Sequence, residues 1–200
     1  DPRLRELLLG GYLPWVNINA GMGPDQAAEL VRTKSLEISP MWDNLKNPNV
    51  YRCPGDTRFK NLQPGRGWSM VSYSKTDGMN GVNWDGSQTP YKKISSINAP
   101  SEAAVFIEEA DPRNGNLGTW VMRKTSWADP FAIFHGNVST FSFADGHADK
   151  RTWVDAQVIQ TARRAVAGDQ NIFPMPGGQK GNPDFEWMWQ HYRFVNWSPL

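Results

Sequence analysis

The strongest constraint on the fold is the stretch FHGNVSTFSFADGHADKRTW (134–153), in which an Asp-Gly pair separates two runs of alternating apolar and polar residues. Phe141 and Phe143 are two positions apart, so they share one face of a β-strand. Asp145 and Gly146 suit the positive φ angles of a two-residue type I′ turn. The sequence therefore predicts that the two runs pair as a β-hairpin.

A helix is predicted directly after the hairpin, where VDAQVIQTARRAVA (154–167) repeats apolar residues at helical spacing. Thr152 is its expected N-cap, with Asp155 three residues later, and Gly168 is its expected end. The predicted apolar stripe consists of Val154, Val158, Ile159, Ala162 and Val166.

Further strands are expected at WSMVSYS (68–74), AVFIEEA (104–110) and FAIF (131–134). If Gly136 and Asn137 form a tight turn, the last of these segments precedes the hairpin in a three-stranded antiparallel meander. The sheet is thus expected to be antiparallel.

The N-terminal quarter is predicted to be helical, and much of the rest to be irregular. Helical patterns occur at RLRELLL (3–9), PDQAAELVRTK (24–34) and MWDNLKN (41–47). Turn-forming residues dominate 50–89 and 169–183, and DFEWMWQHYRFVNW (184–197) predicts a short helix or strand. Because no linker separates two parts, we expect residues 1–200 to form one domain.

Composition excludes several classes of protein. The chain has 21 basic and 20 acidic residues and no long basic run, which argues against nucleic acid as a partner. Cys53 is the one cysteine, so no intramolecular disulfide can form. No apolar run approaches the roughly 18 residues that span a bilayer, so we expect the chain as written to be soluble.

The two histidines of the opening stretch are predicted to lie far apart. In the meander, His135 lies beside Val138 and His147 beside Ala144, at opposite ends of a strand about 20 Å long. They therefore cannot bind one metal ion. His135 is expected to end a strand and hydrogen-bond the backbone of the next loop, and the Asp-Gly pair to close the hairpin. Both are interpreted as structural.

No enzyme is predicted, because the common catalytic patterns are missing. The sequence has no GxSxG, HExxH, P-loop or helix-opening GxGxxG motif, and its single cysteine precludes a CxxC site. Glu108 and Glu109 are neighbours on a strand and point to opposite faces, which disfavours a glycosidase pair.

Calcium remains a candidate ligand. Asp111 and the loop DGMNGVNWDG (77–86), with Asp77 and Asp85, offer oxygen donors on flexible segments, although their spacing is not that of an EF-hand.

The ten tryptophans have two interpretations. Their scatter favours a role in packing the core and sealing loops, with indole N–H groups bonded to backbone carbonyls. The alternative is an exposed aromatic row that stacks on sugar rings. Its candidates are Trp68, Tyr73, Trp84 and Tyr91.

Three segments together resemble a known family. YRCPGD (51–56) contains Cys53, Pro54 and Asp56. In INAPSEAAVFIEEAD (97–111) a Pro-Ser-Glu turn leads into an apolar strand that ends in acidic residues. In the third segment, His135 is followed by nine residues and then by Asp145-Gly146-His147. In this order, the segments resemble the prepilin-like proteins abundant in planctomycete and verrucomicrobial bacteria.

The resemblance implies a pseudopilin-like head of the α+β class, in which an N-terminal helical region packs on an antiparallel sheet with long irregular loops. In such proteins an apolar N-terminal helix, cleaved by a prepilin peptidase, anchors the subunit in the inner membrane and later packs inside a filament. This sequence lacks that helix and the cleavage motif, which we interpret as trimming. Membrane contact is expected through the missing helix alone. Major pseudopilins also hold calcium in a C-terminal loop.

Two functional hypotheses follow from the resemblance and the composition. The first is a subunit of a type IV pilus or type II secretion filament, located in the periplasm or at the cell surface. Its partners would be other pseudopilins or secretion-apparatus proteins, and its motif residues would be structural. The second is an extracytoplasmic glycan-binding or glycan-active protein on a pilin-type anchor, with the tryptophans as its platform.

Overall fold

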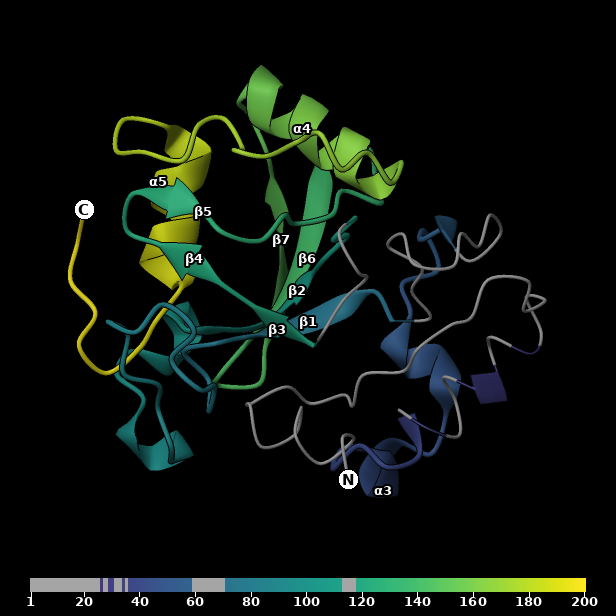
Figure 1. The fold of residues 1–200 in the computed structure, drawn as a ribbon. Helices are drawn as coiled ribbons and strands as arrows, with labels where there is room; N and C mark the ends of the chain where they lie inside the picture. Colours follow the sequence, from purple (N-terminus) through teal and green to yellow (C-terminus); the bar gives the residue numbers. More distant parts are fainter. Residues whose placement is uncertain (1–25, 27–28, 31–33, 35, 59–70, 113–117) are drawn as a thin grey trace.

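The structure, a computed structural model, describes residues 26, 29–30, 34, 36–58, 71–112 and 118–200 (Figure 1). Short helices and a mostly antiparallel sheet make it an α+β fold, as predicted. The helical prediction at 3–9 lies outside the described residues, as does most of the one at 24–34.

The elements follow in a single order along the chain. They are α3 (Trp42–Leu45), η2 (Pro48–Tyr51), β1 (Tyr73–Thr76), η4 (Ile94–Ser96), η5 (Pro100–Glu102), β2 (Ala104–Glu108), β3 (Thr119–Trp120), β4 (Met122–Arg123), β5 (Ser126–Trp127), β6 (Val138–Phe143), β7 (Ala148–Thr152), α4 (Ala156–Val166) and α5 (Pro183–His191).

Five strands form the main sheet, in the order β3-β1-β2-β6-β7, and β4 pairs with β5 separately. All neighbours in the main sheet are antiparallel except β1 and β3. The predicted meander is wrong in one strand, because β2 and not 131–134 pairs with β6. The segment 131–134 makes one isolated bridge, between Phe131 and Glu109, beyond the end of β2.

The predicted hairpin is confirmed as β6 and β7, but its turn differs from the prediction. Among residues 144–147, Gly146 has a positive φ, of 95°, and Asp145 does not. The Phe143 N–H donates to the His147 carbonyl, and the Gly146 N–H to the Phe143 carbonyl. This is a three-residue loop with a left-handed glycine. The Asp145 carboxylate accepts the His147 N–H, which holds the loop in this form.

The predicted helix is α4, which begins later than expected. Asp155 is the N-cap and accepts the N–H groups of Gln157 and Val158. Thr152 cannot cap the helix because it still pairs with Val138 in β7. Consequently Val154 is 59% exposed rather than part of the buried stripe. The predicted end at Gly168 is confirmed, with a φ of 82°.

The two faces of the sheet meet different parts of the chain. Ile107, Phe141 and Phe143 belong to the main core together with residues of α4 and α5. Phe106 and Thr140, at alternate positions, line a pocket with residues of α3 and η2. Figure 1 shows α5 and α3 on opposite sides of the sheet.

Most of the described tryptophans pack the core, as the scatter indicated. Trp120, Trp127, Trp153 and Trp189 are at most 5% exposed. The indole N–H groups of Trp120, Trp127 and Trp189 donate to backbone carbonyls.

Candidate functional site

Cys53, Glu108 and His135 meet at one place although they come from three separate segments. The Cys53 Sγ lies 3.0 Å from the His135 Nε2, and the Glu108 Oε1 lies 3.3 Å from the same nitrogen. Cys53 and Glu108 are buried, whereas the His135 side chain is 42% exposed. A thiol, a carboxylate and an imidazole therefore converge just below the surface.

The Cys-Pro-Gly-Asp turn holds Cys53 in place. The Asp56 N–H donates to the Cys53 carbonyl, and the Cys53 N–H donates to the Ser72 Oγ. Asp56 is fully buried and accepts hydrogen bonds from the Ser72 hydroxyl and the Arg58 guanidinium. The motif residue Asp56 therefore ties the turn to the chain just before β1.

His135 packs directly on Gly55 of the same turn. A Cβ at Gly55 would lie 2.9 Å from the His135 Cε1 and 3.0 Å from the Phe134 carbonyl oxygen, too close for ordinary packing. The expected hydrogen bond between His135 and the segment that follows it is made through the backbone, because the Val138 N–H donates to the His135 carbonyl oxygen. The His135 ring contacts the thiol and the carboxylate.

Glu108 is the last residue of β2, and its side chain is fully buried. Its Oε2 accepts the Thr140 N–H, whereas its Oε1 accepts no hydrogen bond within the described part of the chain. Glu109 points to the other face, as predicted, where its carboxylate lies near those of Asp111 and Asp129.

The electrostatics argue against a cysteine nucleophile. Burial, opposed by the Gly55 N–H and supported by the Glu108 charge, raises the pKa of the Cys53 thiol to about 11. Burial, followed by the charges of Cys53 and Glu108, also raises the pKa of Tyr73 to about 12. A nucleophilic cysteine needs a lowered pKa. The three donor types do suit a transition metal.

The two predicted calcium residues in the 77–86 loop already have internal partners. Both oxygens of the buried Asp77 carboxylate accept backbone N–H groups, from Val82 and Trp84. Burial nevertheless raises the Asp77 pKa. Asp85 accepts hydrogen bonds from Arg123 and Ser87. These carboxylates therefore stabilise the loop itself.

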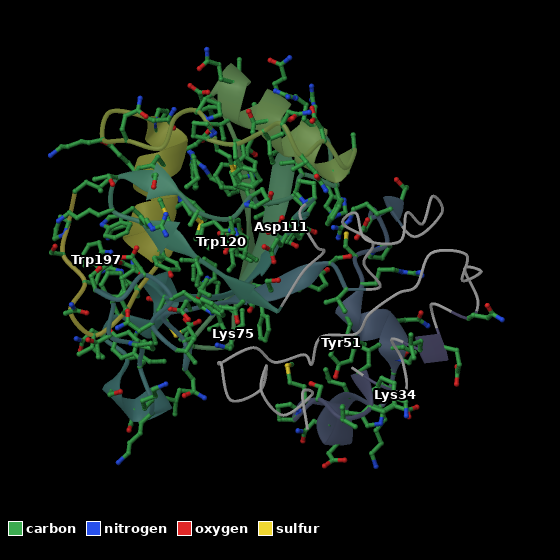
Figure 2. The ribbon with its side chains drawn as sticks, in the orientation of Figure 1. Lys34, Tyr51, Lys75, Asp111, Trp120 and Trp197 are labelled. Carbon is green, nitrogen blue, oxygen red and sulfur yellow. The ribbon has the colours of Figure 1, made fainter. Side chains whose placement is uncertain are left out.

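The third calcium candidate, Asp111, lies in a cluster of carboxylates with Glu109 and Asp129. Figure 2 labels it near Trp120, at the centre of the molecule. Hydrogen bonds within this region already involve the cluster, since the Ser74 hydroxyl donates to Glu109 and the Val121 N–H to Asp129.

The four candidates for a glycan platform do not form one exposed row. Tyr91 is only 4% exposed and packs with Met79, so its ring cannot stack on a sugar. Tyr73 is partly buried in the pocket wall, and Trp84 is half exposed. Trp68 lies outside the described residues.

The hairpin motif residues form a separate pair. The Asp145 carboxylate lies 2.6 Å from the His147 Nδ1, and both side chains are exposed. The His147 hydrogen bonds lower the pKa of Asp145. His135 bridges Val138 at the other end of β6, so the two histidines lie at opposite ends of that strand, as predicted.

An open pocket of about 280 Å³ adjoins the three-residue site. Two residues that line the pocket also adjoin the site, because the Thr140 N–H donates to Glu108 and Tyr73 pairs with Glu108 in the sheet. The remaining lining is mainly apolar and consists of Met41, Leu45, Val50, Tyr51, Phe106, Phe141, Ser142 and Ala148. Figure 2 shows Tyr51 on the side of the molecule away from Trp197.

Comparison with known proteins finds no matching family model, no similar curated protein and no similar solved structure. Within the described ranges, no helix is both long and apolar enough to cross a membrane. Functional inference therefore rests on the motifs and on the geometry of the site.

Proposed function

We propose that the chain is the head domain of a pilin-like or pseudopilin-like subunit. It works through protein–protein contacts in a filament or secretion apparatus outside the cytoplasm, and it catalyses no reaction. Its partners are other pseudopilin subunits or proteins of the secretion apparatus.

One observation carries this proposal: the three segments of the family resemblance meet in space. Cys53 comes from the Cys-Pro-Gly-Asp segment, Glu108 from the strand ending in acidic residues, and His135 from the His-x9-Asp-Gly segment. If the three segments matched the family by chance, their motif residues would have no reason to lie together in the fold. Their contact supports a shared structural unit.

The position of the N-terminal elements gives secondary support. Residues of α3 and η2 line one pocket with Tyr73 of β1, Phe106 of β2 and Thr140 of β6. Such contact between a helical N-terminal region and an antiparallel sheet is what a pseudopilin-like head requires. Leu45 and Val50 remain 38% and 46% exposed beside the pocket.

Site-specific photocrosslinking in cells that make the complete gene product tests the proposal. A crosslinker replaces Val50, and the matched control replaces Ile94, which is 76% exposed in η4. We expect adducts from Val50 that mass spectrometry identifies as a second copy or another pilin-like subunit. If neither the Val50 position nor the Ile94 position gives such an adduct, the proposal is contradicted.

The same cells separate assembly from glycan binding. Where the gene encodes an apolar helix before Asp1, its deletion should abolish the crosslinked adducts but leave any glycan binding intact. Glycan binding without subunit adducts would favour the second hypothesis.

A further inference from the structure

We propose that Cys53, Glu108 and His135 bind one divalent transition-metal ion, and that zinc(II) fits best. The proposal goes beyond the assembly function and does not depend on it. The carboxylate, thiol and imidazole donor atoms all lie within 4.8 Å of one another.

Two of the three donor–donor separations are already close to those that zinc requires. Zinc–sulfur bonds of about 2.3 Å and zinc–nitrogen or zinc–oxygen bonds of about 2.0–2.2 Å place neighbouring donors of a tetrahedral site about 3.3–3.6 Å apart. The separation between Glu108 and His135 is 3.3 Å, and that between Cys53 and His135 is 3.0 Å. The thiol and imidazole need to separate by only about half an ångström.

The Glu108 carboxylate is the independent sign of a missing cation. Its side chain is fully buried, and its Oε1 points into the cluster without accepting a hydrogen bond from the described residues. One His135 Nε2 faces both this oxygen and the Cys53 Sγ, so a single N–H cannot serve both. A buried carboxylate oxygen that accepts no hydrogen bond and only shares one imidazole nitrogen with a thiol is costly. A metal ion would satisfy all three donors together.

Charge and donor type select the ion. A thiolate and a carboxylate supply two negative charges around a neutral imidazole, which balance a divalent cation. A soft thiolate suits zinc, whereas calcium and magnesium prefer oxygen ligands. Three protein donors leave a fourth position for water. The exposed flank of His135 gives the ion a route from solvent.

The cluster would then fasten three parts of the fold. Cys53 lies in the turn before β1, Glu108 ends β2, and His135 lies just before β6. Metal binding to the folded chain stabilises it in proportion to the logarithm of ion concentration over Kd. We therefore expect zinc to raise the melting temperature of the chain.

Cobalt(II) and zinc(II) titrations of the purified chain test the proposal. We expect one equivalent of cobalt to produce a thiolate-to-metal charge-transfer band, which zinc then removes. Zinc should also protect Cys53 from alkylation. Cys53→Ser should abolish the band. Glu108→Gln and His135→Gln should each weaken zinc binding by at least roughly 100-fold, since even outer-shell partners contribute about 10–100-fold.

The chain provides matched controls for both residue types. His147→Gln removes an exposed histidine that also faces a carboxylate, and Glu109→Gln removes the acidic neighbour on the opposite face. Both should bind zinc like the wild type. Loss of binding in these controls but not in the site variants would overturn the proposal.

A wild-type measurement keeps the test valid if a site variant fails to fold. The site is refuted if the native chain shows no cobalt charge-transfer band. It is also refuted if Cys53 is alkylated equally fast with and without zinc. Neither result would bear on subunit crosslinking, so the two proposals fail separately.

Discussion

Trp153 offers the sharpest test of how the core holds the segment that carries His135. The indole is fully buried, stacks on Phe131 with ring centroids 4.0 Å apart, and donates to the Ser139 Oγ at 2.7 Å. The Ser139 hydroxyl in turn donates to the Ala132 carbonyl. This chain of contacts links the strand end at Trp153 to residues 131–135.

Trp153→Phe should lower the free energy of unfolding by about 2–4 kcal/mol. Loss of the indole N–H leaves the buried Ser139 Oγ without its donor, at a cost of about 1–3 kcal/mol. The smaller ring also leaves a void, although less than the one that costs about 3–5 kcal/mol on truncation to alanine. For a chain of this length, the melting temperature should fall by about 5–15 °C.

Urea unfolding monitored by circular dichroism measures this change. Trp84→Phe is the control, because that indole is half exposed, and it should change the free energy of unfolding by less than about 0.5 kcal/mol. Ser139→Ala combined with Trp153→Phe should cost less than the sum of the single changes, since both remove the same hydrogen bond. A Trp153→Phe variant as stable as the control would refute the reasoning.

Four further predictions concern separate positions. Gly55→Ala should displace the His135 ring, lower stability by about 1–3 kcal/mol and broaden the His135 NMR signal; an unchanged signal would contradict the close packing. Burial lowers the pKa of Lys75 to about 8, so below that pH the buried ammonium group reduces the free energy of unfolding. Lys75→Met should therefore raise the free energy of unfolding at pH 7 by about 1–2 kcal/mol, with less gain above pH 10. Burial also lowers the His191 pKa, so stability should decrease as the pH falls below about 6.5, and this dependence should weaken in His191→Gln. If the glycan hypothesis holds, binding on a glycan array should disappear in Trp84→Ala, and an array without binding, with calcium or with chelator, would count against it.

The candidate site was only partly accessible from sequence. Cys53 and His135 each belong to a sequence motif, but they are 82 positions apart and no local pattern indicates their contact. In the sequence, Glu108 stands out only as the neighbour of Glu109. Its place at the end of an apolar strand was the one available signal, since a carboxylate there must lie at a sheet edge or in a polar site.

Burial of polar and aromatic loop residues was also hidden from sequence. Asp77 lies in the turn-rich stretch 50–89 and Tyr91 follows it closely, which predicted exposed ligands at both. In the fold, backbone N–H groups converge on Asp77, and Met79 pairs with Tyr91. Long loops fold back on themselves because their own backbone groups need partners.

By itself, the sequence determined the features that depend on neighbouring residues. A short apolar run specified β2, alternation of apolar and polar residues specified the hairpin of β6 and β7, and Gly168 specified the end of α4. Tertiary structure alone decided that β2 lies between β1 and β6, and that Cys53, Glu108 and His135 converge. The physical reason is that periodicity and turn chemistry act over a few residues, whereas strand order and side-chain convergence depend on which distant surfaces pack together.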